Sequence, residues 1–523
     1  MRTRAIIAAA VLGCAIVSGG WLVQRGLIST GHTASAKVDG GRLFEQVLTR
    51  VRDDYVDSSA AKDVYRKAVD GLMLDLGDPP SLYLTADRLS RLNETTSGKY
   101  AGVGLQIDIR DGWITVVTPL PDSPAEQAGI RTGDRVVEID GKSTHRWTAE
   151  EAQKALRGQP GTPVSLGIDR FGMTAHIPFK VIRRQIRVHS VQHALMLRDG
   201  VGYLDLRVFS DSAAPELRKE IDSLRATGMK RLLLDLRGDP GGLLDQGVAV
   251  SELFLDPGQD IVSMRGRTAA VTRDFRDRTP QPWPDLVLGV LVDSVSASAS
   301  EIVAGALQDH DRAVIIGTTT YGKGSAQTVF DVSGGGLKLT IARWFTPSGR
   351  SINRSHGPAV IDPDSLKNKS AQPRFKTDAG RVVVGGGGIR PDVVVADSAT
   401  GVAWLALTRA LGTHVNDFRD VVTGYALSFK GTGTIASPGF TVTPAMRQDL
   451  LHRLADRKIA LDSATAKTTR PILDQLLVQQ IERYLFGTQA ELTRTLRDDP
   501  IVQRGIELLG KAKTQKEAID KAK

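Results

Sequence analysis

The sequence predicts a multidomain protein with an α/β core, a β-rich domain ahead of it and helical regions toward both ends. At roughly 150 residues per domain, its 523 residues suggest about three folded domains. Between residues 202 and 316, buried-type strands alternate with helices, which is typical of a core with largely parallel strands. Short strands and turns fill the segment before it. We expect boundaries that separate residues 1–38, 39–97, 98–183, 184–400 and 401–523.

The overall composition excludes several classes of protein. Hydrophobic residues make up 41% of the chain, which rules out a wholly disordered protein and a multi-span membrane protein. The net charge is +9, but it is spread along the chain and aromatic residues are only 5%, so we expect no nucleic-acid partner. The only cysteine is Cys14, and no histidine motif has metal-ligand spacing. We therefore expect no disulfide within the chain, no metal and no cofactor.

The first 38 residues have the pattern of an export segment and a linker. Residues 1–4 (MRTR) are basic, and residues 5–23 form an apolar run without charge. The length of this run favours an uncleaved membrane anchor over a cleaved signal peptide, whose apolar part is usually ~7–15 residues. Cleavage is the alternative, because residues 34–36 (ASA) have the form of a cleavage site. Cys14 only faintly resembles a lipid-modified cysteine, because the apolar run continues past it.

Helical periodicity marks both flanking regions. Apolar residues recur at helical spacing from residue 42 to residue 74, until Pro79 and Pro80 break the pattern. Residues 401–411, 446–457 and 468–523 also have a helical pattern, with a break at Pro500. We expect these regions to pack on the core or to mediate self-association.

The β-rich segment has an ordered set of turns, strands and helices. A glycine-rich turn at residues 102–105 (GVGL) enters a strand, a second strand follows at 113–117, and Pro124 begins a short helix. An amphipathic helix follows at residues 148–157. This order resembles a PDZ domain of the bacterial, permuted type. A small β-domain with a glycine turn is the alternative.

The resemblance to a PDZ domain implies a binding mode. An extended C-terminal peptide would add as a strand beside the helix of residues 148–157. Its carboxylate would be held by backbone N–H groups of Gly102, Val103, Gly104 and Leu105. We expect the partners to be proteins with free, mostly apolar C-termini.

Two junctions in the α/β core could carry chemistry. A buried-type strand ends in residues 235–242 (DLRGDPGG), a tight turn into a helix whose N–H groups can face an anion. The strand at residues 286–292 is followed by residues 293–301 (DSVSASASE) and a helix expected at 302–308. Small residues at this second junction would let a serine approach a substrate backbone.

Residues 317–327 (GTTTYGKGSAQ) allow two interpretations. A phosphate-binding P-loop fits Gly317, Gly322 and Lys323, but Gly324 stands where a hydroxyl must bind Mg²⁺. Strands, rather than a helix, are also expected after it. The other interpretation pairs Lys323 with Ser298, because a lysine of depressed pKa can deprotonate a serine hydroxyl. His310 is excluded as the base, since it follows the serine by a helix length of roughly 15–18 Å.

Five motifs together identify the chain as resembling peptidase family S41, the carboxyl-terminal processing or tail-specific proteases. They are residues 235–242, 296–302 (SASASEI), 321–327 (YGKGSAQ), 346–352 (TPSGRSI) and 388–392 (GIRPD). The resemblance covers residues 40–400. It implies a ββα-type, crotonase-like sandwich for the core and a nucleophile 25 residues before the lysine, which selects Ser298 from its neighbouring serines, Ser294, Ser296 and Ser300.

The resemblance also implies roles for other residues. Gln327 would orient the Lys323 amine, and N–H groups of Ala299, Gly241 and Gly242 would stabilise the oxyanion. Asp239 departs from the family, which often has asparagine there, so we expect its carboxylate to point away or to cap the turn. Glu301 is expected to cap the helix after the serine.

These observations predict an exported, ATP-independent serine endopeptidase that recognises C-terminal tails through its PDZ domain and cleaves with a Ser298–Lys323 dyad. A catalytically silent, tail-binding PDZ scaffold is the alternative. A further possible partner is an adaptor protein. The chain could also form a homo-oligomer through its terminal helices. The expected location is the periplasmic side of a bacterial inner membrane, anchored by residues 5–23 or released by cleavage.

Overall fold

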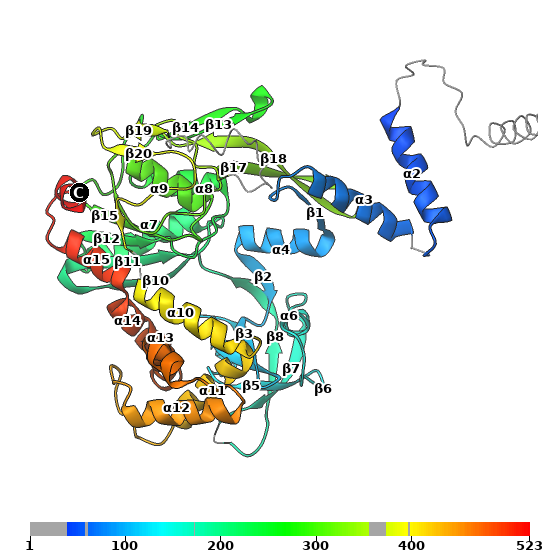
Figure 1. Cartoon of the computed structure of the whole chain (residues 1–523), viewed down its shortest axis with the longest axis vertical. Helices are drawn as coiled ribbons and strands as arrows, with labels where there is room; N and C mark the ends of the chain where they lie inside the picture. Colours follow the sequence, from blue (N-terminus) through cyan, green and yellow to red (C-terminus); the bar gives the residue numbers. More distant parts are fainter. Residues whose placement is uncertain (1–38, 58–60, 172, 355–372, 396–397) are drawn as a thin grey trace, which may run out of the picture. The chain divides into compact units, whose positions relative to one another are not determined.

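The computed structural model describes residues 39–57, 61–171, 173–354, 373–395 and 398–523 (Figure 1). The chain divides into two compact units, Met1–Leu76 and Gly77–Lys523. In the first unit, helices α2 (Gly40–Asp54) and α3 (Ala61–Asp75) pack against each other. The Asp39 carboxylate accepts a hydrogen bond from the Gly41 N–H and caps α2. Large apolar side chains of α2 are exposed, namely Leu43, Phe44, Val47 and Val51.

The second unit is built around a six-stranded sheet of order β10-β11-β12-β15-β16-β21. Strand β10 is antiparallel to β11, and every other neighbouring pair is parallel. Strands β11 and β15 are buried along their whole length, as expected for a parallel sheet with both faces covered. The strands are β10 (Val191–Met196), β11 (Val201–Leu206), β12 (Arg231–Asp235), β15 (Val287–Val292), β16 (Val314–Gly317) and β21 (Val393–Val394).

Alternate side chains of this sheet pack into two different hydrophobic clusters. Leu232 and Leu234 face the cluster that contains helices α7, α8 and α9. Leu233 lies between them in β12 and packs with helices α15 and α16 instead. Because side chains alternate across a strand, the C-terminal helices cover the face opposite to α7–α9 (Figure 1). The helices are α7 (Ala213–Ala226), α8 (Leu244–Glu252), α9 (Ala299–Asp309), α15 (Pro500–Gly510) and α16 (Gln515–Ala522).

A second, antiparallel sheet has the order β1-β18-β13-β14, with β17 paired to β18. Strands β17 and β18 form the hairpin that follows the Lys323 loop. Its elements are β1 (Leu82–Thr85), β13 (Asp260–Gly266), β14 (Arg273–Arg276), β17 (Ser325–Val332) and β18 (Gly335–Phe345). Helix α4 (Ala86–Ser97) packs on β1 and β18, and a short hairpin joins β19 (Arg374–Lys376) to β20 (Val382–Val384).

The β-rich segment forms a separate sheet of order β3-β4-β5-β7-β8, with β6 paired to β5. Strand β3 is the end strand of this sheet, and helix α6 packs beside it. A further two-stranded pair, β2 with β9, leads into and out of this domain. The elements are β2 (Lys99–Gly102), β3 (Leu105–Arg110), β4 (Trp113–Pro119), α5 (Pro124–Gln127), β5 (Arg135–Ile139), β6 (Lys142–Ser143), α6 (Ala149–Leu156), β7 (Pro163–Asp169), β8 (Ile177–Ile182) and β9 (Arg184–Arg187).

Helices of the C-terminal region form their own hydrophobic cluster around residues such as Leu407, Leu454 and Leu477. This region contacts the turn between β3 and β4, where the Asp111 N–H donates to Asp420 over 2.9 Å. The helices are α10 (Ser398–Leu411), α11 (Val415–Ser428), α12 (Pro444–Asp456), α13 (Ser463–Ile481), the π-helical turn Glu482–Phe486 and α14 (Thr488–Asp498).

Individual elements agree with the sequence expectations to different degrees. The helix expected at residues 148–157 is confirmed as α6, and Thr148 caps it by accepting a hydrogen bond from the Glu151 N–H. The helix expected at 302–308 is wrong at its start, because α9 begins at Ala299, directly after the candidate serine. Within the described ranges, no helix has the length and apolar character needed to cross a bilayer. Residues 5–23, the expected anchor, lie outside those ranges.

Candidate active site

Ser298 lies at the N-terminus of α9, at the carboxyl end of the parallel strand β15. Its backbone has φ 56° and ψ −112°, a conformation that costs an L-residue energy and that the surrounding structure must enforce. Helix α9 is buried over its whole length, whereas Ser298 is half-buried. The serine is therefore held in a strained turn with its side chain at the edge of the core. Carboxyl ends of parallel strands are where α/β proteins bind ligands.

The glycine turn after β12 lies directly against Ser298. Gly241 has φ 95°, and a Cβ atom there would lie 2.9 Å from the Ser298 Cβ and 2.6 Å from the Ala297 carbonyl oxygen. A Cβ at Gly242 would lie 2.3 Å from the carbonyl oxygen of Phe209. Only glycine fits at these two positions, because the backbone of the turn is pressed against its neighbours. The structure thus brings Gly241, Gly242 and Ser298 together.

Three predicted oxyanion donors differ in how their N–H groups are used. The Gly241 N–H donates to Asp239 Oδ1 over 2.7 Å. In the part of the chain that the structure describes, the N–H groups of Ala299 and Gly242 donate to no protein acceptor. The two free groups can therefore bind an external oxygen, while that of Gly241 is engaged. Asp239 caps the turn, one of the two placements expected from the sequence, and burial raises its pKa to about 8.

Lys323 lies in the loop between β16 and β17 and is half-buried. Burial lowers the pKa of its amine to about 8, and repulsion from the Lys338 ammonium lowers it further. The negative charges of Glu301 and Asp78 act in the opposite direction. A lysine with such a pKa is neutral in a substantial fraction of molecules at slightly alkaline pH. Sequence reasoning missed Lys338 and Asp78, because neither lies in a motif.

Glu301 joins the serine segment to the lysine segment. Its Oε2 accepts hydrogen bonds of 2.9 Å from the backbone N–H groups of both Ser298 and Lys323. Its Oε1 accepts from the Thr320 hydroxyl over 2.6 Å and from the Gly322 N–H over 2.7 Å. The side chain is fully buried, and burial raises the pKa of its carboxyl group, although the four hydrogen bonds act in the opposite direction. The expected helix cap is confirmed by the Ser298 bond, and the link to Lys323 is new.

Gln327 lies on β17, next to the lysine loop. Its amide nitrogen donates to the Ser325 hydroxyl over 2.9 Å and to Thr340 Oγ1 over 3.1 Å. The Thr340 hydroxyl in turn donates to Asp78 over 2.7 Å. This chain of bonds connects Gln327 to one of the carboxylates that act on Lys323, and it fixes the orientation of the glutamine side chain.

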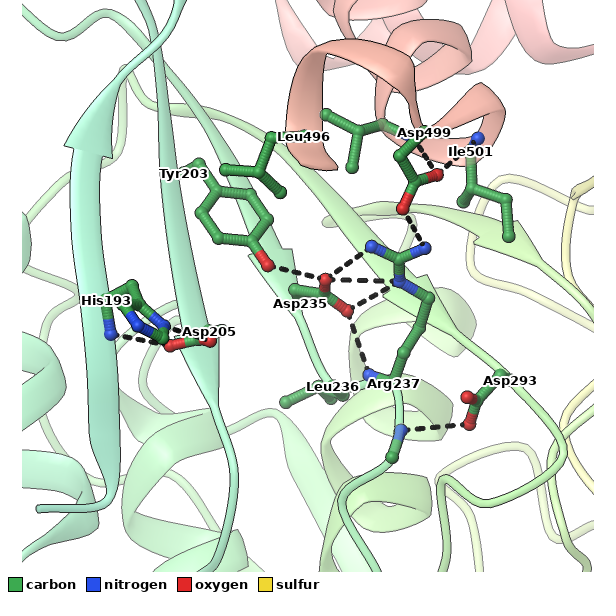
Figure 2. Close-up of polar contacts among 12 residues, drawn as sticks. His193, Tyr203, Asp205, Asp235, Leu236, Arg237, Asp293, Leu496, Asp499 and Ile501 are labelled. Atoms are coloured by element: carbon green, nitrogen blue, oxygen red, sulfur yellow. Dashed lines mark hydrogen bonds and ion pairs between the residues drawn. The ribbon is translucent and has the colours of Figure 1, made fainter. Parts of the chain in front are cut away.

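A network of charges fixes the strand end that precedes the glycine turn (Figure 2). The Asp235 carboxylate accepts hydrogen bonds from the Tyr203 hydroxyl over 2.8 Å and from the Arg237 guanidinium. Arg237 also binds Asp499, the residue that caps α15, over 2.7 Å. The N–H group of Gly238, the residue after Arg237, donates to Asp293. Asp293 lies in the serine loop, residues 293–298, which connects β15 to α9. The turn is thereby held by the C-terminal region on one side and by the serine loop on the other.

The excluded interpretations can be compared with the structure. His310 is the residue that ends α9, where its ring contacts Asp378 and the Asp260 carbonyl oxygen. It therefore lies at the opposite end of the helix from Ser298. Strand β17, and no helix, follows the lysine loop, which contradicts a P-loop. Both exclusions made from the sequence are confirmed.

The predicted carboxylate-binding turn connects β2, which ends at Gly102, to β3, which begins at Leu105. Within the described residues, the N–H groups of Val103 and Gly104 donate to no protein acceptor. Their carbonyl oxygens are engaged, because they accept from the N–H groups of Ala125 and Leu120. Gly104 has φ 78°, and a Cβ there would lie 2.3 Å from the Ser123 Cβ. The turn thus presents backbone donors next to the free edge of β3.

Comparison with known proteins gives matches over the β-rich segment and over the α/β core. The profile of the PDZ domain matches residues 115–170, and that of peptidase family S41 matches residues 200–366. The Carboxy-terminal-processing protease of Bartonella bacilliformis is 40% identical over 338 residues, which cover 64% of this chain and 76% of that protein. The carboxy-terminal processing protease CtpA of Bacillus subtilis is 34% identical over 330 residues, 62% of this chain and 68% of that protein.

Among solved structures, the photosystem II D1 C-terminal processing protease is 28% identical, with a TM-score of 0.37, and the match covers 68% of this chain and 87% of that one. The family assignment rests on the sequence matches, which span the PDZ segment, the glycine turn, the serine junction and the lysine loop. The chain belongs to peptidase family S41 and is a serine peptidase of the carboxy-terminal-processing type that carries a PDZ domain.

Proposed function

We propose that the chain is an exported, ATP-independent endopeptidase in which Ser298 is the nucleophile and Lys323 the general base. The observation that carries this proposal is the shared carboxylate of Glu301, whose Oε2 binds the N–H groups of both residues at 2.9 Å. One buried carboxylate thereby sets the distance between the backbone segments that bear the hydroxyl and the amine. The depressed pKa of Lys323 supports the same assignment, because a base must be neutral to accept a proton.

The reaction would proceed by acyl transfer. Neutral Lys323 takes the proton of the Ser298 hydroxyl as its oxygen attacks the peptide carbonyl carbon. The N–H groups of Ala299 and Gly242, with that of Gly241 once released from Asp239, stabilise the negative oxygen. Protonated Lys323 then gives its proton to the leaving amine, and water hydrolyses the acyl-enzyme by the same route. Gln327, fixed by Ser325 and Thr340, would orient the lysine amine.

The PDZ domain would select substrates by their C-termini. The free donors at Val103 and Gly104 suit a terminal carboxylate, and the adjacent edge of β3 can take an added strand. Helix α6 would form the other wall of the groove. Partners would thus be proteins with free, apolar C-termini, held while an upstream bond enters the active site.

The test of tail recognition uses the wild-type enzyme and two substrates. One protein substrate has a free apolar C-terminus, and its twin ends in an amide. We expect kcat/KM to fall about tenfold or more for the twin, because amidation removes the charge that the turn would bind. Equal cleavage of the two would contradict the proposal. A substitution at Gly104 is a weaker test, since any Cβ would collide with Ser123 and disturb the fold.

The role of Glu301 can be tested by Glu301→Gln. The amide nitrogen of glutamine cannot accept, so two of the four donors would lose their partner in a buried site, at a cost of about 1–3 kcal/mol each. We expect a lower melting temperature and a kcat reduced at least tenfold. Glu252→Gln, in a half-buried position on α8, is the matched control and should change neither value strongly. Full activity of Glu301→Gln would contradict the coupling of serine and lysine.

The remaining expectations are part of the proposal. Residues 5–23 would export the chain and anchor it on the periplasmic side of the inner membrane, with cleavage as the alternative. The exposed apolar side chains of α2 support self-association through the terminal helices, and an adaptor protein would be a further partner. The domain boundaries given above and a crotonase-like arrangement of the core are proposed as well; the parallel strands and α9 support the latter.

A further inference from the structure

Asp239 is a buried acid next to the reacting serine, and its protonation plays no part in the mechanism above. Its side chain has no exposed surface, and Oδ1 accepts the Gly241 N–H over 2.7 Å. Within the described residues, Oδ2 is buried and has no hydrogen-bond partner. A buried polar atom without a partner is costly, and the cost is much larger for a carboxylate than for a neutral carboxyl group.

The backbone of Asp239 ties the glycine turn to the serine helix. Its carbonyl oxygen accepts hydrogen bonds from the Ala297 N–H over 3.1 Å and from the Ser300 hydroxyl over 3.0 Å. These two donors flank Ser298 in sequence. The carboxyl group is therefore attached to the same rigid segment as the nucleophile, and a change in its charge would be felt at the oxyanion donors.

The charged groups around Asp239 compensate it poorly. Among the described residues, Arg207, after β11, is the cation that acts on the carboxyl, and it is already bound to Asp205 and to the Arg237 carbonyl oxygen. Asp293 faces the turn from the serine loop, and Glu301 lies on α9. The desolvation of Asp239 outweighs the Gly241 hydrogen bond, the attraction to Arg207 and the nearby Ser300 hydroxyl, so its pKa is raised to about 8.

We propose that Asp239 is a positioning residue that supports catalysis only as the neutral acid and shuts the oxyanion site when it ionises. In the neutral form, Oδ1 holds the turn through a weak bond that the Gly241 N–H can exchange for the substrate oxygen. In the ionised form, the carboxylate holds that N–H by a charge-assisted bond and places a negative charge beside the developing oxyanion. The step is a proton equilibrium with solvent, and no other bond changes.

This inference rests on the proposed function and gives the pH profile a second limb. Activity rises as Lys323 loses its proton and falls as Asp239 loses its own, each with a pKa of about 8. The wild-type enzyme should therefore show a narrow bell centred near pH 8. Above roughly pH 9, kcat/KM should fall about tenfold per pH unit.

Asp239→Asn is the test, because asparagine keeps an oxygen for the Gly241 N–H and cannot ionise. We expect this variant to keep the rising limb and to stay at a plateau from pH 9 to 10. Asp245→Asn, the same change at an exposed position at the start of α8, should keep the wild-type bell. Asp239→Ser, whose hydroxyl can also accept from Gly241, should likewise lose the falling limb and serves if the asparagine variant does not fold.

The outcomes separate this inference from the proposed function. A wild-type profile without a falling limb, a falling limb that persists in folded Asp239→Asn, or a folded but inactive Asp239→Asn would each overturn it. Activity must return when the wild-type enzyme is brought back to pH 8, since irreversible loss would mean alkaline unfolding and would also contradict it. If no hydrolysis depends on Ser298, the proposed function fails and the inference fails with it.

Discussion

Ser298→Ala is expected to lose proteolytic activity by about 10⁴- to 10⁶-fold, the range seen when a serine peptidase loses its nucleophile. The reason is that no other hydroxyl of the loop can take its place. Ser296 and Ser300 are buried and bind the carbonyl oxygens of Leu236 and Asp239. Ser294 is exposed in the same loop and provides the matched control. Digestion of an unstructured protein such as casein measures both variants.

The control decides how the loss is interpreted. Ser294→Ala should retain nearly full activity and both variants should keep the wild-type melting temperature, since neither substitution removes a buried group. Residual activity of Ser298→Ala above about a hundredth of wild type would rule out Ser298 as the nucleophile.

Lys323→Arg is expected to lower kcat by about 10²- to 10⁴-fold, the usual contribution of a general base. A guanidinium group keeps its proton in proteins, so arginine preserves the charge of Lys323 while removing the base. The same assignment predicts that wild-type activity rises with pH as the amine, with a pKa of about 8, becomes neutral. Measuring kcat/KM from pH 6 to pH 8 with a saturating tail checks this rising limb.

Lys338→Met is the companion variant for this prediction. The Lys338 ammonium lowers the pKa of Lys323, so removing it should raise that pKa and move the rising limb to higher pH without abolishing activity. Full turnover by Lys323→Arg, or a profile already flat from mildly acidic pH, would contradict the dyad.

Local sequence signals located most elements but not the start of the central helix. The buried side chains of α7 recur every three or four residues along one face, so its helical periodicity is visible in the sequence. Helix α9 is buried on every side and has no polar face to mark its first turn. Its start is set by the strained backbone of Ser298 and by the bond from Ser298 to Glu301, which depend on contacts with the lysine loop.

The residues of the candidate site also differ in whether a local sequence pattern reveals them. Ser298, Lys323 and the glycine pair lie in short motifs with recognisable spacing, so the sequence could single them out. Asp78, Lys338 and the second role of Glu301 arise from contacts between segments far apart in the chain, and no local pattern contains them. The burial of Asp239 likewise depends on the folded structure, so it could not be predicted from the sequence.

The most direct test of the central claim is to identify the residue that a serine-directed fluorophosphonate modifies, by mass spectrometry of the digested wild-type enzyme. We expect one adduct, on Ser298, whose rate of formation rises from pH 6 to pH 8 and is much lower in Lys323→Arg. The small probe does not need the PDZ groove, so the result is independent of tail recognition. No adduct, as expected for a silent scaffold, or an adduct on another residue would contradict the account.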